Sequence, residues 1–580
     1  MRRLVAVGAD ERLTVVTLSP EVTDLTDRAR AWISADPDPR TRAELRGLIE
    51  SGDLDELAAR MDGSLQFGTA GLRGEVGAGS NRMNLAVVIR ATAGLAAHLS
   101  DASGPVVVGF DARPDSRAFA EAAAGVLTAR GIEVLYFPEA TPTPLVAFAA
   151  KHHEASAAIV ITASHNPPAD NGYKVYDANA AQIIPPVDEE IAGHIEQAGP
   201  ATEIARQEHV FSGGSELARS VPDGWFDAYW DEVSGARLRK EGSSLSIVYT
   251  PIHGVGGRYL DSLFRKAGHG QLAMVEEQAE PDGSFPTVPF PNPEEPGALD
   301  LVLALGEELG ADLILANDPD ADRLAAMVGT ADGFRSMTGN ELGILLGDYL
   351  LSGHIGPERP IVASSVVSTP MMARVAAARG ALHAVTLTGF KWIVNAGLAL
   401  ERAGEGRFVF GYEEALGYTV GGIVRDKDGL SAALILTDLA ADLADRGATV
   451  LHRLLELWEA HGIWASTQLS VAGEPGALVA AVDRLASSPP SSLGPYAVHG
   501  INDYREGAES RPPWLGAQDL VELDLGEAGR VLARPSGTEP KLKIYVDLAA
   551  EPGADPLTRH RELTETAAGL GSELEAALEL

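Results

Sequence analysis

Three segments of this chain repeat one order of elements, and that repeat restricts the possible fold more than any other feature. Each segment has the pattern strand, helix, strand, helix and strand, at residues 106–161, 246–316 and 360–410. Strands that alternate with helices form a mostly parallel sheet through right-handed crossovers. We therefore expect three similar α/β domains with mixed, mostly parallel sheets, each presenting the loop after its last strand to one central cleft.

The pattern changes after about residue 462. A strand, a helix at 476–486 and a Ser/Pro-rich loop are followed by two apolar strands on either side of 534–541. This order predicts a smaller C-terminal α+β domain. The expected division is a weakly ordered tail at 1–20 and domains at 21–220, 221–336, 337–462 and 463–580.

Length, charge and cysteine content exclude several classes of protein. At 580 residues the chain is too long for a single hydrophobic core. Its 82 acidic residues outnumber its 46 basic residues, and the net charge of −36 argues against a nucleic-acid partner. The absence of cysteine excludes disulfides and thiolate metal sites and suits a reducing cytoplasm. No apolar run reaches the ~18 residues that a membrane helix needs, so no membrane partner is expected.

A serine follows the last strand of the first segment. The apolar run ends at Ile161, and Thr162-Ala-Ser-His-Asn-Pro-Pro168 then places Ser164 on a loop at the carboxyl end of a strand, where α/β sheets bind ligands. Attack on a carbonyl is disfavoured, because the Gly-x-Ser-x-Gly elbow is absent and His165, as the sequence neighbour, is poorly placed to pair with the serine. A serine that carries a phosphoryl group fits better. An ordinary serine in a Pro-terminated turn is the alternative.

Three aspartates follow the last strand of the second segment. Asp318, Asp320 and Asp322 are spaced at two, so a strand-like stretch would aim all three carboxylates the same way. Carboxylates clustered this closely need a hard divalent cation, and Mg²⁺ is the usual one. The alternatives are a solvated acidic turn and a phosphatase loop that uses Asp318 as nucleophile.

Charged residues elsewhere complete a set of ligand-binding loops. Arg323 follows the aspartates and is placed to orient a phosphate beside the metal. Glu413 follows the third segment and offers a carboxylate to sugar hydroxyls. Lys427, among cations near a metal, is expected to have a depressed pKa that suits proton transfer, with an ordinary surface lysine as the alternative. The segment Arg534-Pro-Ser-Gly-Thr-Glu-Pro-Lys541 supplies hydroxyls, a glycine and two cations, which are the parts of a phosphate cradle.

The chain resembles a known superfamily in four motifs. These are FGTAGLRG at 67–74, TASHNPP at 162–168, NDPDADR at 317–323 and GYEEALGY at 411–418. In this order they are similar to the motifs of the α-D-phosphohexomutases, the superfamily of phosphoglucomutases and phosphomannomutases. The resemblance extends from about residue 67 to residue 546. It is strongest to the branch that contains phosphopentomutase and glucose-1,6-bisphosphate synthase.

The resemblance implies four domains around one cleft and a role for each loop. Ser164 would be a phosphoserine, and with Asp318, Asp320 and Asp322 it would bind Mg²⁺. The implied catalytic residues are Arg73, Lys174, Lys427 and His165, and the implied substrate-binding residues are Arg323, Lys391, Glu413, Arg534, Ser536, Gly537, Thr538 and Lys541. One position departs from the pattern, because Ala415 replaces a serine that many hexomutases have.

We therefore expect an intramolecular phosphotransferase of the isomerase class. It would interconvert hexose 1-phosphate and hexose 6-phosphate, with glucose and then mannose as the sugars, Mg²⁺ as cofactor and glucose 1,6-bisphosphate as activator or intermediate. Phosphopentomutase and glucose-1,6-bisphosphate synthase are the alternatives within the superfamily. A metal-dependent phosphatase and a non-catalytic sugar-phosphate sensor are the alternatives outside it. The expected partner is a small phosphosugar, and the expected state is a cytoplasmic monomer or dimer.

Overall fold

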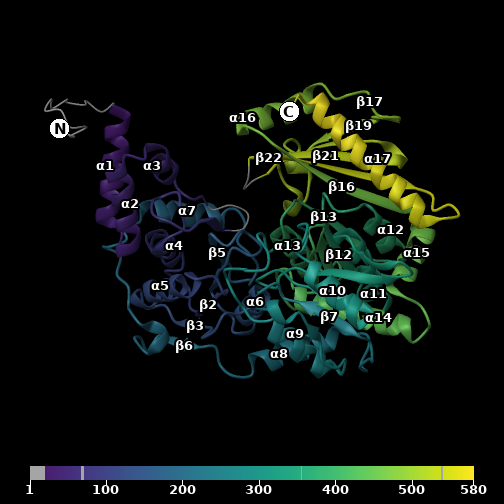
Figure 1. The fold of residues 1–580 in the computed structure, drawn as a ribbon, viewed down its shortest axis with the longest axis horizontal. Coiled ribbons are helices and arrows are strands. Elements are labelled where there is room, and N and C mark those ends of the chain that lie inside the picture. The colour runs from purple at the N-terminus through teal and green to yellow at the C-terminus, as the bar shows by residue number, and fades with distance from the viewer. Residues whose placement is uncertain (1–19, 67–70, 355, 537–539, 580) are drawn as a thin grey trace.

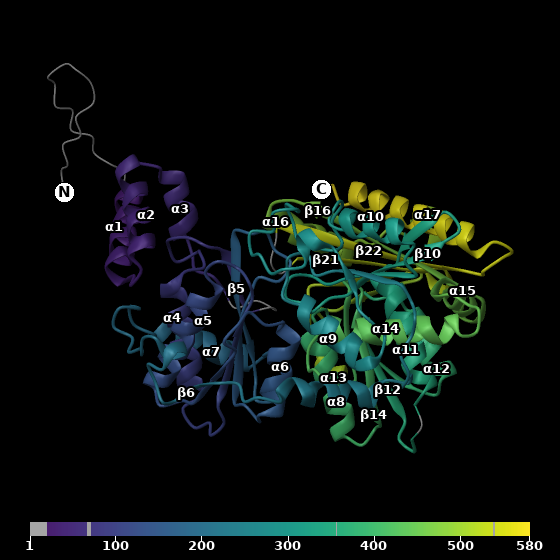
Figure 2. The same ribbon diagram turned by 60° about the horizontal axis from the view of Figure 1, so that its bottom comes forward.

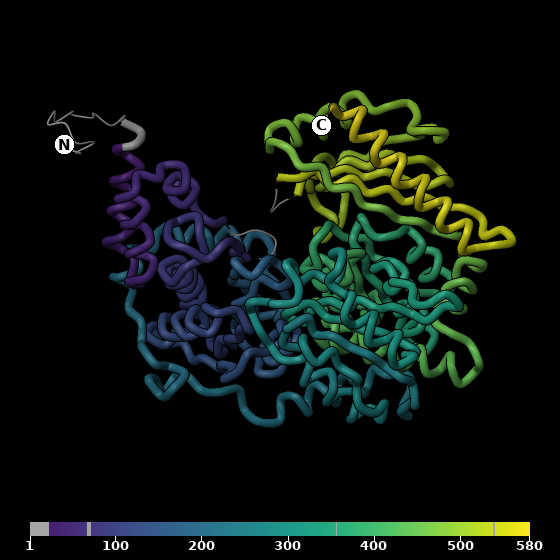
Figure 3. The backbone as a smooth tube through the Cα atoms, viewed as in Figure 1, coloured from purple at the N-terminus to yellow at the C-terminus, as the bar shows by residue number. Residues whose placement is uncertain are grey.

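Four domains surround one cleft in the computed structural model, which describes residues 20–66, 71–354, 356–536 and 540–579. In Figure 1 the first domain lies on the left, and the fourth, in yellow, lies above the third. The tube in Figure 3 shows that the purple N-terminal helices lie on the outer side of the first domain and that the yellow C-terminal helix lies in the fourth. Of the tail predicted at 1–20, residues 1–19 lie outside the described residues, and Pro20 begins a helix. Within them, no helix is long and apolar enough to cross a membrane.

Three helices precede the first sheet and form a small layer on the outer side of the first domain (Figure 2). They are α1 (Pro20–Ala35), α2 (Pro39–Ser51) and α3 (Leu54–Met61). The Asp38 carboxylate accepts a hydrogen bond from the Arg40 amide and caps α2, and Asp53 caps α3 in the same way. The helices share a core that includes Leu45 and Leu57.

The first domain contains a six-stranded mixed sheet of order β1-β5-β4-β2-β3-β6. Its strands are β1 (Leu72–Glu75), β2 (Val106–Phe110), β3 (Val134–Tyr136), β4 (Ala157–Ile161), β5 (Asp170–Tyr176) and β6 (Ala218–Ser220). Its helices are α4 (Leu85–His98), α5 (Ser116–Ala129), α6 (Thr143–His152) and α7 (Val187–Gln197). Every residue of β2 and β4 is buried, which explains the continuous apolar runs in the sequence.

The second and third domains have smaller sheets, of order β11-β10-β9-β7-β8 and β13-β12-β14-β15. The strands of the second are β7 (Ile247–Thr250), β8 (Ala273–Met274), β9 (Leu313–Ala316), β10 (Ala325–Thr330) and β11 (Gly333–Ser336), with helices α8 (Trp225–Ala236), α9 (Gly257–Ala267) and α10 (Asp300–Leu309). Those of the third are β12 (Pro360–Ser365), β13 (Leu382–Thr386), β14 (Arg407–Glu413) and β15 (Gly417–Val420), with helices α11 (Gly339–Ser352), α12 (Met371–Ala378), α13 (Phe390–Arg402), α14 (Gly429–Ala444) and α15 (Val450–His461).

The three sheets repeat one module, as the sequence predicted. In each, the first strand of the repeat lies between the second and the third, with all three parallel. The third strand also pairs with an antiparallel strand that the sequence did not predict, namely β5, β10 or β15. Each polar loop therefore joins two neighbouring strands. In β5 the acidic Asp170 and the cleft-lining Lys174 interrupt the apolar pattern by which a strand is recognised in sequence.

The fourth domain is an antiparallel sheet of order β16-β22-β21-β20-β19, packed against helices α16 (Pro475–Ser487) and α17 (Pro556–Ala577). Its strands are β16 (Ile463–Ala472), β19 (Gly500–Asp503), β20 (Val521–Asp524), β21 (Gly529–Pro535) and β22 (Lys541–Ala550), and β17 (Ser492–Leu493) and β18 (Tyr496–Ala497) form a separate hairpin. An apolar cluster with Val366 and Val367 of the third domain and Leu520 and Leu532 of the fourth joins the two. The proposed divisions after residues 220, 336 and 462 lie between the four sheets.

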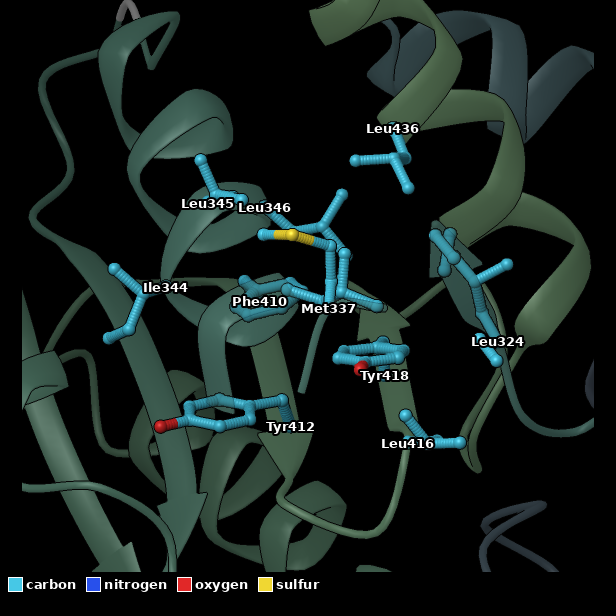
Figure 4. Packing of buried hydrophobic residues seen from close by; sticks show 14 of the residues in the cluster. Leu324, Met337, Ile344, Leu345, Leu346, Phe410, Tyr412, Leu416, Tyr418 and Leu436 are labelled. Atoms are coloured by element: carbon cyan, nitrogen blue, oxygen red, sulfur yellow. The ribbon is translucent and has the colours of Figure 1, made fainter. Parts of the chain in front are cut away.

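A buried apolar cluster contains residues of both the second and the third domain (Figure 4). Phe410 and Tyr412, two residues apart on β14, stack with ring centroids 6.0 Å apart. Leu345 of α11 and Leu436 of α14 are fully buried in the same cluster. This packing fixes the end of β14, and therefore the loop that begins at Glu413.

Candidate active site

The cleft where the four domains meet has a volume of about 1520 Å³. Residues of every predicted loop line it, namely Arg73, Ser164, His165, Lys174, Asp322, Arg323, Glu413, Lys427, Arg534, Ser536 and Lys541. Lys391 is not part of this lining, because it is buried at the start of α13 with Nζ 5.7 Å from the centre of the Trp392 ring. Gly537 and Thr538 lie outside the described residues.

Ser164 lies on the loop between β4 and β5 and is almost fully buried. Its hydroxyl donates a hydrogen bond to Asp318 Oδ2 at 2.6 Å and lies 3.1 Å from His165 Nδ1. The expectation that neighbours in sequence would not pair is therefore wrong. The backbone of Ser164 is left-handed, with φ of 51°, so the usual alternation of side-chain directions does not hold here.

The three aspartates form a buried cluster whose ligand oxygens all lie within 4.8 Å of one another. They converge through a turn, with Ala321 left-handed at φ of 57°, so the predicted strand-like stretch is wrong although the convergence is right. One oxygen of Asp320 and one of Asp322 are buried without a hydrogen-bond partner. Buried carboxylate oxygens that lack a donor fit a hard cation such as Mg²⁺.

Two lysines compensate the charge of this cluster. Lys174 Nζ, on β5, donates to Asp320 Oδ2 at 2.8 Å and to Asp322 Oδ2 at 3.0 Å. Lys427 Nζ lies 3.3 Å from Asp322 Oδ2 and 3.1 Å from Asp426 Oδ1. Burial alone would lower the pKa of Lys427, but these carboxylates raise it above its ordinary value. The predicted depressed pKa is therefore wrong, and Lys427 is a positive charge.

The aspartates differ in their charge. Burial and the neighbouring carboxylates of Asp320 and Asp322 raise the pKa of Asp318 well above its ordinary value. Burial also acts against ionisation of Asp322, but the Lys174 and Lys427 ammonium groups outweigh it and lower the pKa of Asp322. Among the three, burial and the other carboxylates therefore favour the protonated form at Asp318, whereas the two ammonium groups favour the ionised form at Asp322.

Contacts between domains hold the loops together. Thr143, at the start of α6 in the first domain, donates through Oγ1 to Asp320 Oδ2 at 2.7 Å and through its amide to Asp320 O at 3.0 Å. Arg323 forms an isolated bridge with Gly417 of the third domain. No motif in the sequence indicated Thr143, because this residue acts on a loop that lies 177 positions away.

Three glutamates from two domains lie at the cleft wall. Burial raises the pKa of Glu413 to about 7, against the opposing effects of Lys427 and Arg323. Glu414 accepts hydrogen bonds from Ser365 Oγ at 2.9 Å and from Ser368 Oγ at 3.1 Å. Glu294, which the sequence did not single out, pairs with Arg323 at 3.2 Å. The wall therefore combines carboxylates that can accept hydrogen bonds from hydroxyl groups with a guanidinium that can bind a phosphate.

The fourth domain presents cations to the cleft. Residues alternate along β22, so Leu542 and Ile544 are buried in the domain core while Lys541 and Lys543 line the cleft. Arg534 of β21 pairs with Lys543 of β22 and lines the cleft as well. Three cations on one sheet face, in a chain of net charge −36, indicate an anionic ligand.

Family models for the phosphoglucomutase/phosphomannomutase α/β/α domains I, II and III match residues 64–201, 224–333 and 338–461, and the model for the C-terminal domain matches residues 502–551. The chain belongs to this family. It is accordingly an isomerase-class phosphotransferase, and the predicted superfamily, enzyme class and four-domain architecture are confirmed. The matched segments contain all four of the motifs on which the resemblance rested.

Several curated proteins resemble this chain over nearly their whole length. A probable phosphoribomutase of Schizosaccharomyces pombe is 38% identical over 91% of this chain and 94% of its own. The Homo sapiens phosphopentomutase is 34% identical over 94% of this chain and 96% of its own. The Homo sapiens glucose 1,6-bisphosphate synthase is 32% identical over 90% of this chain and 89% of its own.

A solved structure shows the same fold. It is a putative phosphomannomutase from Thermus thermophilus, with a TM-score of 0.68 at 22% identity, covering 89% of this chain and all of the other.

Proposed function

We propose that this enzyme is a phosphosugar mutase in which Ser164 carries the transferred phosphoryl group. The observation that carries the proposal is the 2.6 Å hydrogen bond from Ser164 Oγ to Asp318, which joins the serine loop to a carboxylate cluster that fits a metal. Lys174 and Arg323 bring positive charge to the same place. A phosphoryl group needs this combination of a metal site and cations.

The carboxylates of Asp318, Asp320 and Asp322 would hold Mg²⁺ together with a phosphate on Ser164. When bound, the ion neutralises charge on the phosphoryl oxygens. Arg534, Ser536 and Lys541, with the predicted Gly537 and Thr538 of the same loop, would bind the phosphate that does not react. This assignment leaves the middle of the cleft, with Glu413, for the sugar.

The phosphoryl transfer proceeds in two steps. The bond between Ser164 Oγ and phosphorus breaks as a sugar hydroxyl oxygen bonds to that phosphorus, and the hydroxyl proton passes through a base in the cleft to the departing Ser164 Oγ. His165 is the proposed base, because its Nδ1 lies 3.1 Å from Ser164 Oγ. Burial and the cations Arg323 and Arg73 lower the pKa of His165, and a phosphoryl dianion beside it would raise that pKa again. The sugar bisphosphate then turns end for end. The bond between its other phosphoryl group and the sugar oxygen breaks as Ser164 Oγ bonds to that phosphorus, and the serine hydroxyl proton passes through the same base to the sugar oxygen.

A hexose is the first substrate that we propose, with glucose before mannose and glucose 1,6-bisphosphate as the intermediate. The choice of a hexose rests on Glu413, whose carboxylate can accept hydrogen bonds from ring hydroxyls. A pentose phosphate is the second candidate. It is favoured by the names phosphoribomutase and phosphopentomutase that belong to relatives 38% and 34% identical over more than nine tenths of this chain. It is also favoured by Ala415, which lines the cleft and offers the sugar no hydroxyl.

The test is turnover of glucose, mannose and ribose 1-phosphates by wild type and by Ser164→Ala, with mass spectrometry of the peptide that contains Ser164. We expect one added phosphate on Ser164, turnover of glucose 1-phosphate by wild type, and loss of turnover in Ser164→Ala. Normal turnover by Ser164→Ala would contradict the phosphoserine and favour an Asp318 phosphatase. A hundredfold preference for ribose 1-phosphate would identify the enzyme as a phosphopentomutase.

A further inference from the structure

Arg113 lies buried beneath the loop that presents Ser164, and nothing in the sequence patterns gave it a role. It follows β2 and is only 3% exposed. Its guanidinium donates four hydrogen bonds to main-chain carbonyls of the loop, through Nη2 to Ser164 O at 2.7 Å and Asn166 O at 2.6 Å, and through Nη1 to Pro167 O at 2.7 Å and Asp170 O at 2.8 Å. One side chain therefore binds both ends and the middle of the turn.

The four carbonyl oxygens need this cation. They converge on one point, where their partial negative charges would repel each other without a positive group between them. A planar guanidinium has five N–H donors in a fixed fork, whereas a lysine ammonium has three donors around a single point. The geometry of this turn therefore requires an arginine and not only a positive charge.

Asp111 fixes the guanidinium from the opposite side. Its Oδ2 lies 3.2 Å from Arg113 Nε, and its Oδ1 accepts hydrogen bonds from the Arg113 amide at 3.0 Å and from Ser116 Oγ at 2.6 Å. Ser116 Oγ in turn accepts a hydrogen bond at 3.0 Å from Nδ2 of Asn171, which lies near the start of β5. Arg113 is thus anchored to the rigid end of β2 before it binds the loop.

Arg113 also contacts the second domain. Its guanidinium carbon lies 5.1 Å from the centre of the Phe285 ring. A Cβ atom on Gly283 would lie 2.4 Å from Arg113 Cα, so only a glycine permits this approach. The residue therefore lies between the serine loop and the domain that carries the three aspartates.

We propose that Arg113 is a positioning residue that holds Ser164 in its left-handed conformation, so that Ser164 Oγ faces Asp318. A non-glycine residue is strained at φ of 51° and keeps that conformation only where its surroundings impose it. The four carbonyl hydrogen bonds impose it here. The inference rests on the proposed function of Ser164 and adds how the chain aims that serine at the metal site.

The test compares Arg113→Lys with Arg117→Lys. Arg117 is a matched control, because it lies four residues further on and its guanidinium donates to one carbonyl, Pro138 O at 2.7 Å, beside the rings of Phe110 and Phe211 and away from the serine loop. We expect Arg113→Lys to lower kcat at least about tenfold with KM within about threefold, because misplacement of a reacting atom affects the chemical step more than binding. Amide hydrogen exchange should become faster at residues 162–172 and stay unchanged elsewhere. Arg117→Lys should change neither kcat nor exchange.

Two results would overturn the proposal. One is an Arg113→Lys variant with kcat within twofold of wild type and unchanged exchange at 162–172. The other is faster exchange throughout the first domain, because Arg113 would then support the whole fold and not the loop. Failure of the proposed function is distinguishable, since it would appear as turnover by Ser164→Ala. Arg113→Gln removes the positive charge as well as the guanidinium. We expect it to show the same local change in hydrogen exchange as Arg113→Lys and a kcat that is no higher.

Discussion

Lys174 Nζ lies 2.8 Å from Asp320 Oδ2, which joins the first domain to the second through a buried ion pair. Both side chains are almost fully buried, and Lys174 also binds Asp322 at 3.0 Å. The ammonium group therefore compensates two carboxylates that would otherwise repel each other. Because Lys174 approaches only one oxygen of each carboxylate, it leaves the other oxygens available to a metal ion.

Replacing Lys174 with methionine should destabilise the metal-free protein. Removing one partner of a buried ion pair leaves an uncompensated charge and costs about 3–5 kcal/mol. Since Mg²⁺ would supply the missing positive charge, it should raise Tm more in Lys174→Met than in wild type. The measurement is thermal unfolding with EDTA and with Mg²⁺. The control is Lys266→Met, whose exposed pair with Asp227 should contribute no more than about 1 kcal/mol.

An equal effect of Mg²⁺ on the Tm of wild type and Lys174→Met would contradict this account. It would mean that the lysine and the metal do not compensate the same carboxylates. Loss of stability in Lys266→Met to the same extent would show that the change reflects a general loss of charge and not the buried site.

Asp318→Asn and Asp322→Asn should separate the two charge states of the cluster. Asparagine resembles a protonated aspartate, and burial with the neighbouring carboxylates raises the pKa of Asp318, so this aspartate takes up a proton more readily than Asp322 does. Asp318→Asn should therefore leave the Tm in EDTA within about 2 °C of wild type, a change of under ~1 kcal/mol. Asp322 is ionised between Lys174 and Lys427, so Asp322→Asn should lower stability by about 2–4 kcal/mol.

Both variants should lose Mg²⁺-dependent turnover, since each removes a carboxylate that would bind the ion. Turnover and Tm are measured on the same preparations, so that loss of activity can be separated from loss of fold. Equal destabilisation of the two variants in EDTA would contradict the assignment of charge. Full activity of either variant in EDTA would contradict the metal site.

The sequence predicted the parts of the site that are local in the chain. Ser164 and the three aspartates each follow an apolar strand, and the spacing of the aspartates alone indicated a cation. Thr143 and Arg113 were not assigned a role, because they act through contacts with loops at positions that only the fold brings near. Lys174 was known only from the family resemblance. Its strand, β5, has charged residues among the apolar ones and does not show a clear period of two.

Acid should weaken the third domain through His383. The Nε2 atom of this side chain lies 2.8 Å from Ser364 Oγ, and burial with the nearby Arg530 lowers the pKa of His383 to about 4. An unfolded histidine has a pKa of about 6.5, so between these values the unfolded chain binds a proton that the folded chain does not. Stability therefore falls as pH decreases from about 6.5 to 4. The shift in pKa sets an upper limit of about 3 kcal/mol on the free energy of unfolding that is lost. The actual loss is smaller, because part of the His383 ring is accessible to water.

The pH effect is measured by urea unfolding of wild type and His383→Gln at pH 7 and pH 5. The variant should lose less stability between the two pH values than wild type does. His354→Gln is the control, because His354 is half-exposed and its Nε2 lies 2.8 Å from a carbonyl, Glu358 O. If wild type and His383→Gln lose the same stability between pH 7 and pH 5, His383 is not the group responsible.

The choice of sugar should depend weakly on Ala415. This residue lines the cleft beside Glu414, whose carboxylate is held by Ser365 and Ser368 and is therefore fixed in place. A serine at position 415 could exchange a hydrogen bond with a ring hydroxyl, whereas alanine leaves that hydroxyl to water. Such a replacement costs about 0.5–1.5 kcal/mol, so wild type should discriminate loosely between glucose and mannose.

Ala415→Ser should therefore shift specificity toward hexose by no more than about tenfold, which corresponds to ~1.4 kcal/mol. The measurement is kcat/KM for glucose, mannose and ribose 1-phosphates in wild type and variant. Ala415→Gly is the matched control, because it also lacks a hydroxyl and should not shift preference toward hexose. A shift much larger than tenfold would mean that the serine moves Glu413 or Glu414 and does not simply add one hydrogen bond. An unchanged ratio in Ala415→Ser would place the sugar away from this residue and leave Glu413 as the main contact to test.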